Sequence, residues 1–226
     1  MDRHDCDGIP ASVRVKWRLF SLGVPLSVAS GLRQQAVRLF MLVLVLALGA
    51  CSNEQPKFTG IDLTGSKTDL QFTLTDVDGK DRTLADFRGS YVMVFYGFTQ
   101  CPDVCPTTLA RAVEVKKKLG SDGQKLKVVF ISVDPERDTA ELVRNYLQAF
   151  DREFIGLRGT PEQTQIAAKA LHVFYEKVPS GSSYSINHTA ITYILDAQGN
   201  LRLGMRNEQG ADDYVADLRT LMKQSS

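Results

Sequence analysis

The sequence predicts an α/β protein, a thioredoxin-like sandwich with an N-terminal β-hairpin extension, and three observations lead to that prediction. Predicted strands and helices alternate in the order β-β-β-α-β-α-β-α-β-β-α between residues 70 and 226. The uncharged run YVMVFYGF (91–98) has the composition of a strand that crosses a core. A cysteine pair, Cys101 and Cys105, follows that strand at the turn into a helix, as in redox-active proteins of this type.

The hairpin extension is the first element of the predicted domain, and order is expected to begin near Leu70. Phe72, Leu74 and Val77 precede Asp78-Gly79, a dipeptide typical of a two-residue hairpin turn. We therefore expect two short antiparallel strands before the strand at 91–98.

A parallel crossover unit is expected around and after the cysteines. Apolar residues recur at helical spacing from Leu109 to Gly120, and KLKVVFISV (125–133) is typical of a buried strand. Strand, helix and strand in this order predict two parallel neighbours joined by a right-handed crossover.

The remaining elements complete the sandwich. A helix is expected at 139–150, and another begins at Thr160-Pro161, with threonine as the N-cap and proline at the first helical position. Short strands are expected at 154–159, 189–195 and 201–205, and a closing helix at 212–222. The segment PSGSSYSIN (179–187) contains one glycine and four serines, which predicts a flexible loop that leads to His188 at the start of the next strand.

Residues 1–50 have the features of a leader and signal peptide. The run LFMLVLVLALGA (39–50) is uncharged and follows Arg33 and Arg38. Its length is too short for a bilayer, which takes about 20 residues. Residues 1–31 are long for the start of a signal peptide and carry three aspartates, which indicates a translation start assigned too far upstream.

Cys51 is a candidate lipidation site, because Leu48-Gly49-Ala50-Cys51 resembles a bacterial lipobox. The alternatives are a signal peptide cut elsewhere and an uncleaved anchor. In the favoured interpretation, residues 51–69 are the lipidated cysteine and a polar tether. Residues 70–226 then form the folded domain, held by acyl chains at the periplasmic side of a bacterial membrane.

The charge balance argues against nucleic acid as a partner. The chain has 27 Lys and Arg against 26 Asp and Glu, and residues 1–50 hold six and three of these, which leaves 21 basic and 23 acidic side chains in the exported part. A nucleic-acid-binding domain normally carries a clear basic excess.

Cys101, Cys105 and His188 are the residues predicted to carry the chemistry. Free backbone N–H groups and the helix dipole favour a thiolate at the first turn of a helix. The spacing C-x-x-x-C, in place of C-x-x-C, favours metal binding over disulfide exchange. Two thiolates and one imidazole suit Cu(I) and Cu(II), whereas zinc usually takes a fourth protein ligand. The alternatives are a structural disulfide, which would stabilise little across so small a loop, and a packed or surface histidine.

Three separated motifs add a family resemblance. The segments GFTQCPDVCPTTL (97–109), VDPERDT (133–139) and NHTAITYILDAQGN (187–200) resemble the Sco (SenC) family of copper-binding, thioredoxin-fold assembly factors for cytochrome c oxidase. The resemblance covers roughly Lys57 to Met222. It implies that Cys101, Cys105 and His188 bind Cu(I) or Cu(II). It also implies that the protein metallates the dinuclear copper site of oxidase subunit II or reduces the cysteines there.

The second motif contributes residues whose roles stay open. Asp134 is similar to a family acidic residue near the site, which implies a role in tuning or transferring copper, although an aspartate before proline is equally an ordinary turn former. We interpret Arg137 and Asp138 as turn and ion-pair residues, and His172 as a packed or surface side chain. An oxidase partner favours the inner membrane as the location. A lipidated Cys51 would serve as the membrane anchor in place of the transmembrane helix that many family members have.

The leading hypothesis is a membrane-anchored, monomeric copper chaperone, which is not itself an enzyme. It would pass copper to cytochrome c oxidase subunit II or to another copper acceptor by ligand exchange. The first alternative is a thiol-disulfide reductase with Cys101 or Cys105 as the attacking thiolate. The second is a copper or redox sensor that signals through a partner.

Overall fold

The computed structural model describes residues 34–35, 38–40 and 57–224. The chain divides into two compact units, Met1–Gln55 and Pro56–Ser226. In the first unit, residues 34–35 and 38–40 are helical; the remainder of the predicted leader and Cys51 lie outside the described residues. Within the described ranges, no helix combines the length and the apolar character needed to cross a membrane.

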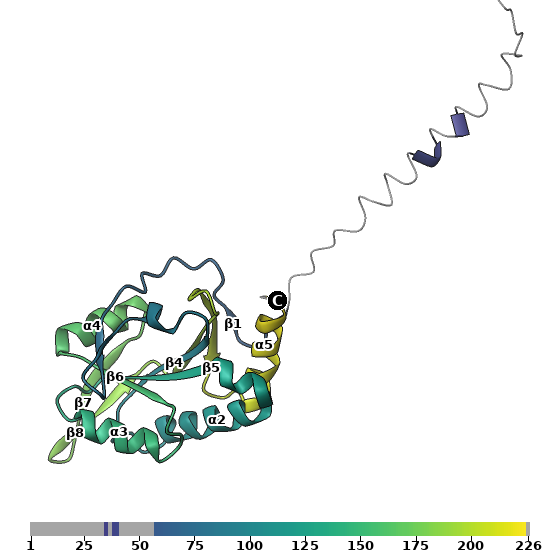
Figure 1. Ribbon diagram of the computed structural model, residues 1–226. Helices are drawn as coiled ribbons and strands as arrows, with labels where there is room; N and C mark the ends of the chain where they lie inside the picture. The colour runs from purple at the N-terminus through teal and green to yellow at the C-terminus, as the bar shows by residue number, and fades with distance from the viewer. Residues whose placement is uncertain (1–33, 36–37, 41–56, 225–226) are drawn as a thin grey trace, which may run out of the picture. The chain divides into compact units, whose positions relative to one another are not determined.

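An eight-stranded sheet forms the centre of the second unit (Figure 1). Strand β4 lies in its middle, parallel to β5 and antiparallel to β9, and the strand order is β1-β10-β9-β4-β5-β6-β2-β3. The bounds of these strands are β1 (Ile61–Asp62), β2 (Leu74–Asp76), β3 (Asp81–Arg82), β4 (Tyr91–Gly97), β5 (Leu126–Ser132), β6 (Ile155–Arg158), β9 (Ile191–Leu195) and β10 (Leu201–Arg206).

Helices cover both faces of this sheet, which confirms the predicted thioredoxin-like sandwich. Side chains of α2 (Val104–Leu119), α3 (Ala140–Gln148) and α5 (Ala211–Gln224) share one hydrophobic cluster, and α4 (Pro161–Ala170) belongs to the cluster on the opposite face. Two short 3₁₀ helices, η1 (Leu84–Phe87) and η2 (Gly120–Lys125), lie in the connections before β4 and β5.

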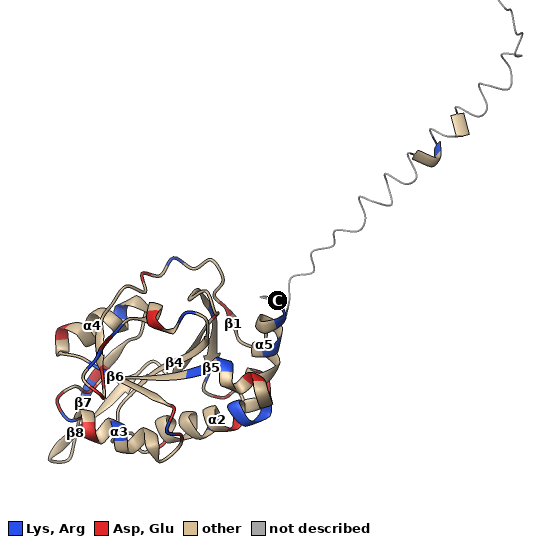
Figure 2. Cartoon of the chain, viewed as in Figure 1, with Lys and Arg blue, Asp and Glu red and all other residues tan. Residues whose placement is uncertain are grey.

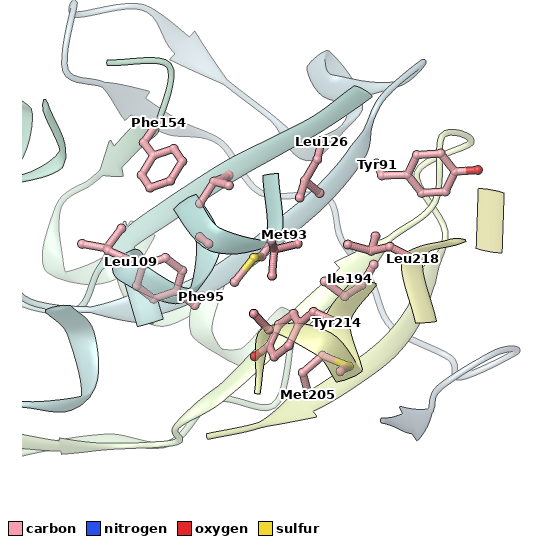
Figure 3. Close-up of a cluster of buried hydrophobic side chains, with 14 of the residues drawn as sticks. Tyr91, Met93, Phe95, Leu109, Leu126, Phe154, Ile194, Met205, Tyr214 and Leu218 are labelled. Carbon is pink, nitrogen blue, oxygen red and sulfur yellow. The ribbon is translucent and has the colours of Figure 1, made fainter. Parts of the chain in front are cut away.

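The alternation of side chains along β4 divides the core into these two clusters. Met93 and Phe95 point into the cluster that α2 and α5 complete, as Figure 3 shows, whereas Val92 and Val94 point to the α4 side. All seven residues of β4 are buried, so both faces of the strand contribute about 1.5–3 kcal/mol for each large apolar side chain. This buried strand fixes the position of the cysteine-bearing turn that follows it.

The helix caps and the opening hairpin confirm local predictions. Thr160 and Gln163 form a capping box at the start of α4, with Pro161 in the first helical position. The Thr139 hydroxyl caps α3 by accepting a hydrogen bond from the Leu142 backbone N–H. Strands β2 and β3 pair on either side of the predicted turn. Basic and acidic residues are interspersed along the ribbon of the domain (Figure 2).

The ordered domain begins before Leu70, so the predicted tether at residues 51–69 is too long. Ile61 in β1 pairs with Gly204 in β10. The Asp217 carboxylate accepts hydrogen bonds from the backbone N–H groups of Thr59 (2.9 Å) and Gly60 (2.8 Å). This segment has few large apolar residues, and its order comes from partners more than 140 positions away that sequence periodicity does not reveal.

The segment predicted as a flexible loop at 179–187 is part of a β-hairpin. Strands β7 (Tyr175–Ser180) and β8 (Ser183–His188) pair along their whole length, and Gly181 takes the positive φ that the turn requires. His188 therefore ends β8 and does not open the next strand. The serines of this segment weaken any strand signal in the sequence, and cross-strand hydrogen bonding supplies the stability instead.

Candidate metal centre

The two cysteines occupy the turn between β4 and α2. The backbone N–H of Cys101 donates to the Phe98 carbonyl (3.2 Å), and Cys105 lies in the first turn of the helix. Both are free thiols; Cys101 is partly exposed, whereas Cys105 is 1% exposed. The pair thus offers one sulfur to solvent and keeps the other inside the protein.

Hydrogen bonding makes these two thiols electrostatically unequal. Interaction with the Cys105 side chain, assisted by a hydrogen bond with His188, lowers the pKa of Cys101 to about 3. The same Cys101–Cys105 contact and burial raise the pKa of Cys105. At neutral pH these shifts favour the thiolate at Cys101 and the protonated thiol at Cys105. An exposed thiolate of this kind is both a metal ligand and a nucleophile.

His188 reaches this pair from the end of β8. Its ring packs edge-on against Phe98 with the ring centroids 6.2 Å apart, and its Nδ1 lies 3.1 Å from the Thr189 carbonyl oxygen. His188 also lines a small pocket together with Cys105. All three predicted ligands therefore lie in one place, and Cys101 contacts both of the others.

The ligands are neighbours but do not form a preorganised metal cage. In the part of the chain that the structure describes, no group of three or more His, Cys, Asp or Glu side chains could hold a metal ion as these side chains stand. The contacts instead join the thiols and the imidazole through hydrogen bonds. A metal that used all three side chains as ligands would replace these interactions, and the side chains would have to move.

Gly97, the last residue of β4, makes room for the buried sulfur. A Cβ atom at this position would lie 2.7 Å from the Cys105 Sγ and 2.9 Å from the Phe130 Cε2. Distances below 3.0 Å do not occur for real Cβ contacts, so a side chain here would displace one of these groups. The absence of a side chain at Gly97 thus allows the Cys105 sulfur to pack against β4.

Asp134 is bound to the hairpin that carries His188. Its buried carboxylate forms an ion pair with Arg137 and accepts a hydrogen bond from the Tyr184 hydroxyl (2.7 Å). The Arg137 guanidinium also stacks 3.7 Å from the Tyr184 ring centroid. Tyr184 lies in β8, four residues before His188, so these contacts anchor the hairpin to the connection after β5.

Asp138 has a role that sequence reasoning missed. It was predicted to be a turn and ion-pair residue, yet it is fully buried and forms no ion pair among the described residues. Its carboxylate accepts hydrogen bonds from the Thr99 hydroxyl (2.6 Å) and the Ser132 hydroxyl (2.6 Å). These bonds tie the turn before Cys101 to the end of β5. Burial raises the pKa of Asp138, and no signal in the sequence distinguishes it from exposed acids.

Comparison with known proteins gives consistent matches. A model of the SCO1/SenC family matches residues 60–223. "Protein SCO2 homolog, mitochondrial" of Mus musculus is 36% identical over 152 residues, which cover 66% of this chain and 60% of the relative. The human "Protein SCO1 homolog, mitochondrial" is 33% identical, covering 67% of this chain and 52% of the relative. The chain thus spans about half to three fifths of the length of these curated relatives.

The matches to solved structures cover a larger share of the matched protein. Bradyrhizobium japonicum ScoI with copper bound has a TM-score of 0.61 and 38% identity, covering 66% of this chain and 96% of that protein. The apo Sco1 protein from Thermus thermophilus has a TM-score of 0.67 and 37% identity, covering 75% and 99%. The similarity therefore extends over nearly the whole of each of these two solved domains.

Proposed function

The chain belongs to the SCO1/SenC family, and on that basis we propose that it is a copper chaperone that binds Cu(I) or Cu(II) through Cys101, Cys105 and His188. The observation that carries this proposal is that the three candidate ligands lie together: His188 lines one pocket with Cys105, and both side chains act on Cys101 to lower its pKa. The copper bound to the similar ScoI of Bradyrhizobium japonicum supports the same cargo here.

The donor set fits copper. Two thiolates and an imidazole are soft or borderline ligands, which Cu(I) accepts at low coordination number and Cu(II) accepts with an added oxygen ligand. The arrangement also suits a carrier, because Cys101 is partly exposed and an acceptor could approach its sulfur. Binding begins at the Cys101 thiolate; Cys105 then releases its proton to solvent, and His188 completes the set.

Delivery by ligand exchange needs an acceptor that can approach Cys101. The acceptor in this proposal is the dinuclear copper site of cytochrome c oxidase subunit II. This acceptor is what the resemblance of the three sequence motifs to the Sco (SenC) family implies. Acylation of Cys51 would hold the monomeric domain at the periplasmic face of the inner membrane, close to such an acceptor. Asp134 acts in this scheme through Tyr184, by holding the hairpin that presents His188.

A second function is favoured by the inequality of the thiols. The exposed Cys101 thiolate would attack an acceptor disulfide and form a mixed disulfide with release of one acceptor thiolate. Cys105 would then attack Cys101, forming the Cys101–Cys105 disulfide and transferring its proton to the second acceptor sulfur. This reductase would keep the acceptor cysteines ready for metal, and it does not require His188.

The test is an anaerobic copper titration of the reduced full chain and of two histidine variants. We expect one tightly bound copper in the wild type, with a thiolate-to-Cu(II) absorption band, and a sharp loss of affinity in His188→Ala. His172→Ala is the matched control, because His172 is exposed at the end of α4 and should leave copper binding unchanged. Equal copper retention in His188→Ala would reject the three-ligand carrier. Rapid reduction of a test disulfide without stable copper would assign the reductase function.

A further inference from the structure

A cavity of about 330 Å³ lies between the sheet and the segment that follows β1. In Figure 1 this segment arches from β1 toward α4. None of the three candidate copper ligands lines the cavity, so it is separate from the candidate metal centre. Its walls are largely apolar, and they include Ile61 of β1, Ile191 of β9, Leu201 and Gly204 of β10, and Leu171 at the end of α4.

The size of the cavity suits a small organic molecule. Sites for such ligands have volumes of about 300–1,000 Å³. At about 30 Å³ for each water-sized group, this cavity holds about ten non-hydrogen atoms. Gly204 contributes to the space, because a Cβ atom there would lie 3.3 Å from the Leu63 Cδ1 and 3.4 Å from the Ile191 Cγ2. A larger side chain at this position would therefore fill part of the cavity.

Tyr193 is a buried polar residue in this apolar wall. The residue is 5% exposed and lines the cavity, and its hydroxyl forms no hydrogen bond among the described residues. Most buried polar groups in native proteins have a hydrogen-bond partner, and an exception calls for an explanation. A bound molecule with a hydrogen-bond acceptor would supply that partner.

The charged groups of the wall favour an anion. Lys67 and His172 both line the cavity, and neither forms an ion pair among the described residues. No Asp or Glu lines it, whereas Asp69 and Asp196 line a neighbouring hollow. His172 also has a φ of 53° at the end of α4, a backbone conformation that favours glycine. A glycine would avoid this strain but would remove a side chain from the wall.

We propose that this cavity binds a small monocarboxylate with an apolar body of about eight carbon atoms, which together with two carboxylate oxygens makes about ten non-hydrogen atoms. The body occupies the space beside Gly204. The carboxylate accepts a hydrogen bond from the Tyr193 hydroxyl, and Lys67 and His172 supply basic groups. Because all of these groups line one small cavity, a single ligand can contact them. This binding is independent of copper.

The test is equilibrium dialysis of labelled octanoate against the copper-free full chain. Octan-1-ol offers the same apolar body without the charge, and acetate offers the charge without the body. Tyr193→Phe removes only the hydroxyl, and Lys67→Gln removes the charge. Lys80→Gln is the matched control, because Lys80 is exposed and lies outside the cavity wall. Gly204→Val fills the cavity, and its Tm by circular dichroism reports whether it is folded.

We expect one saturable octanoate per chain, with octan-1-ol and acetate each bound at least about tenfold more weakly. Tyr193→Phe should weaken octanoate binding by about tenfold or more, and Lys67→Gln by up to about fivefold, because a hydrogen bond to a carboxylate contributes more than an exposed ion pair. Folded Gly204→Val should lose binding. Lys80→Gln and His188→Ala should bind octanoate like the wild type.

The absence of saturable octanoate binding would overturn this inference, and so would equal binding of octan-1-ol. Wild-type affinity in folded Gly204→Val would place the octanoate elsewhere and also overturn it. If Gly204→Val does not fold, wild-type affinity in both Tyr193→Phe and Lys67→Gln has the same meaning. Copper titration does not enter these outcomes, so the inference and the proposed function fail separately.

Discussion

Gly97 is the position at which one added methyl group tests the packing behind the site most directly. The substitution is Gly97→Ala. The new Cβ would lie 2.7 Å from the Cys105 Sγ and 2.9 Å from the Phe130 Cε2, whereas carbon and its neighbours pack best at about 3.5–4.0 Å. Each group would therefore have to move by roughly 1 Å. Neither is the end of a flexible side chain, because Cys105 is short and Phe130 is fully buried.

Because two neighbours must move, we expect a loss near the upper end of the range for overpacked cores, about 2–3 kcal/mol in the free energy of unfolding. For a domain of this size the loss corresponds to a fall in Tm of about 4–12 °C. Displacement of the Cys105 sulfur also alters its contact with Cys101, so copper affinity should fall as well.

Urea unfolding of the copper-free protein measures the first effect, and chelator competition measures the second. Gly210→Ala is the control, since it adds the same methyl group where no atom lies within 4 Å. The control should change stability by less than about 1 kcal/mol and leave copper affinity unchanged. The reasoning is refuted if Gly97→Ala is as stable as the wild type and binds copper equally well.

Two further predictions concern protonation. With a Cys101 pKa of about 3, its alkylation by iodoacetamide should stay nearly constant from about pH 8 to about pH 5, whereas an ordinary thiol slows roughly tenfold per pH unit in this range. Cys105→Ala removes the largest cause of the lowered pKa but leaves the His188 interaction, so alkylation of Cys101 should then slow more steeply as the pH falls. Burial opposes ionisation of Asp76, but the Arg82 guanidinium and two backbone N–H groups outweigh it and hold its pKa below 3.8. A lowered carboxyl pKa stabilises the fold above pH 3.8, and this stabilisation is lost as the pH falls through the folded-state pKa. Between about pH 5 and pH 2, the Tm of Asp76→Asn should therefore fall less with decreasing pH than the Tm of the wild type. An equal fall in the two proteins would contradict the assignment.

Local sequence patterns predicted most of the elements, because the forces that define them act within a few residues. The Asp78-Gly79 turn, the Thr139 and Thr160 caps and the uncharged run of β4 each carry their own signal. The candidate ligands were also identifiable by type, since few other side chains in the exported part are soft donors for a metal.

Long-range pairing explains where local prediction went wrong. Strand β1 depends on β10 and on Asp217, and the serine-rich hairpin β7–β8 depends on pairing between its own two weak strands. Neither segment contains enough apolar residues to indicate a strand by itself. Their order is therefore a property of the partners that they meet in the folded chain.

The sequence by itself determined the fold class, the cysteine pair and the candidate histidine. Only the tertiary structure decided that Cys101 is the partly exposed thiol with the lowered pKa and Cys105 the buried one, and that Gly97 makes room for the latter. It also placed the Asp138 carboxylate against the turn that leads to Cys101. The physical reason is that burial, charge interaction and hydrogen bonding depend on distance in space, and these residues come from β4, the turn that follows it, α2 and the turn before α3.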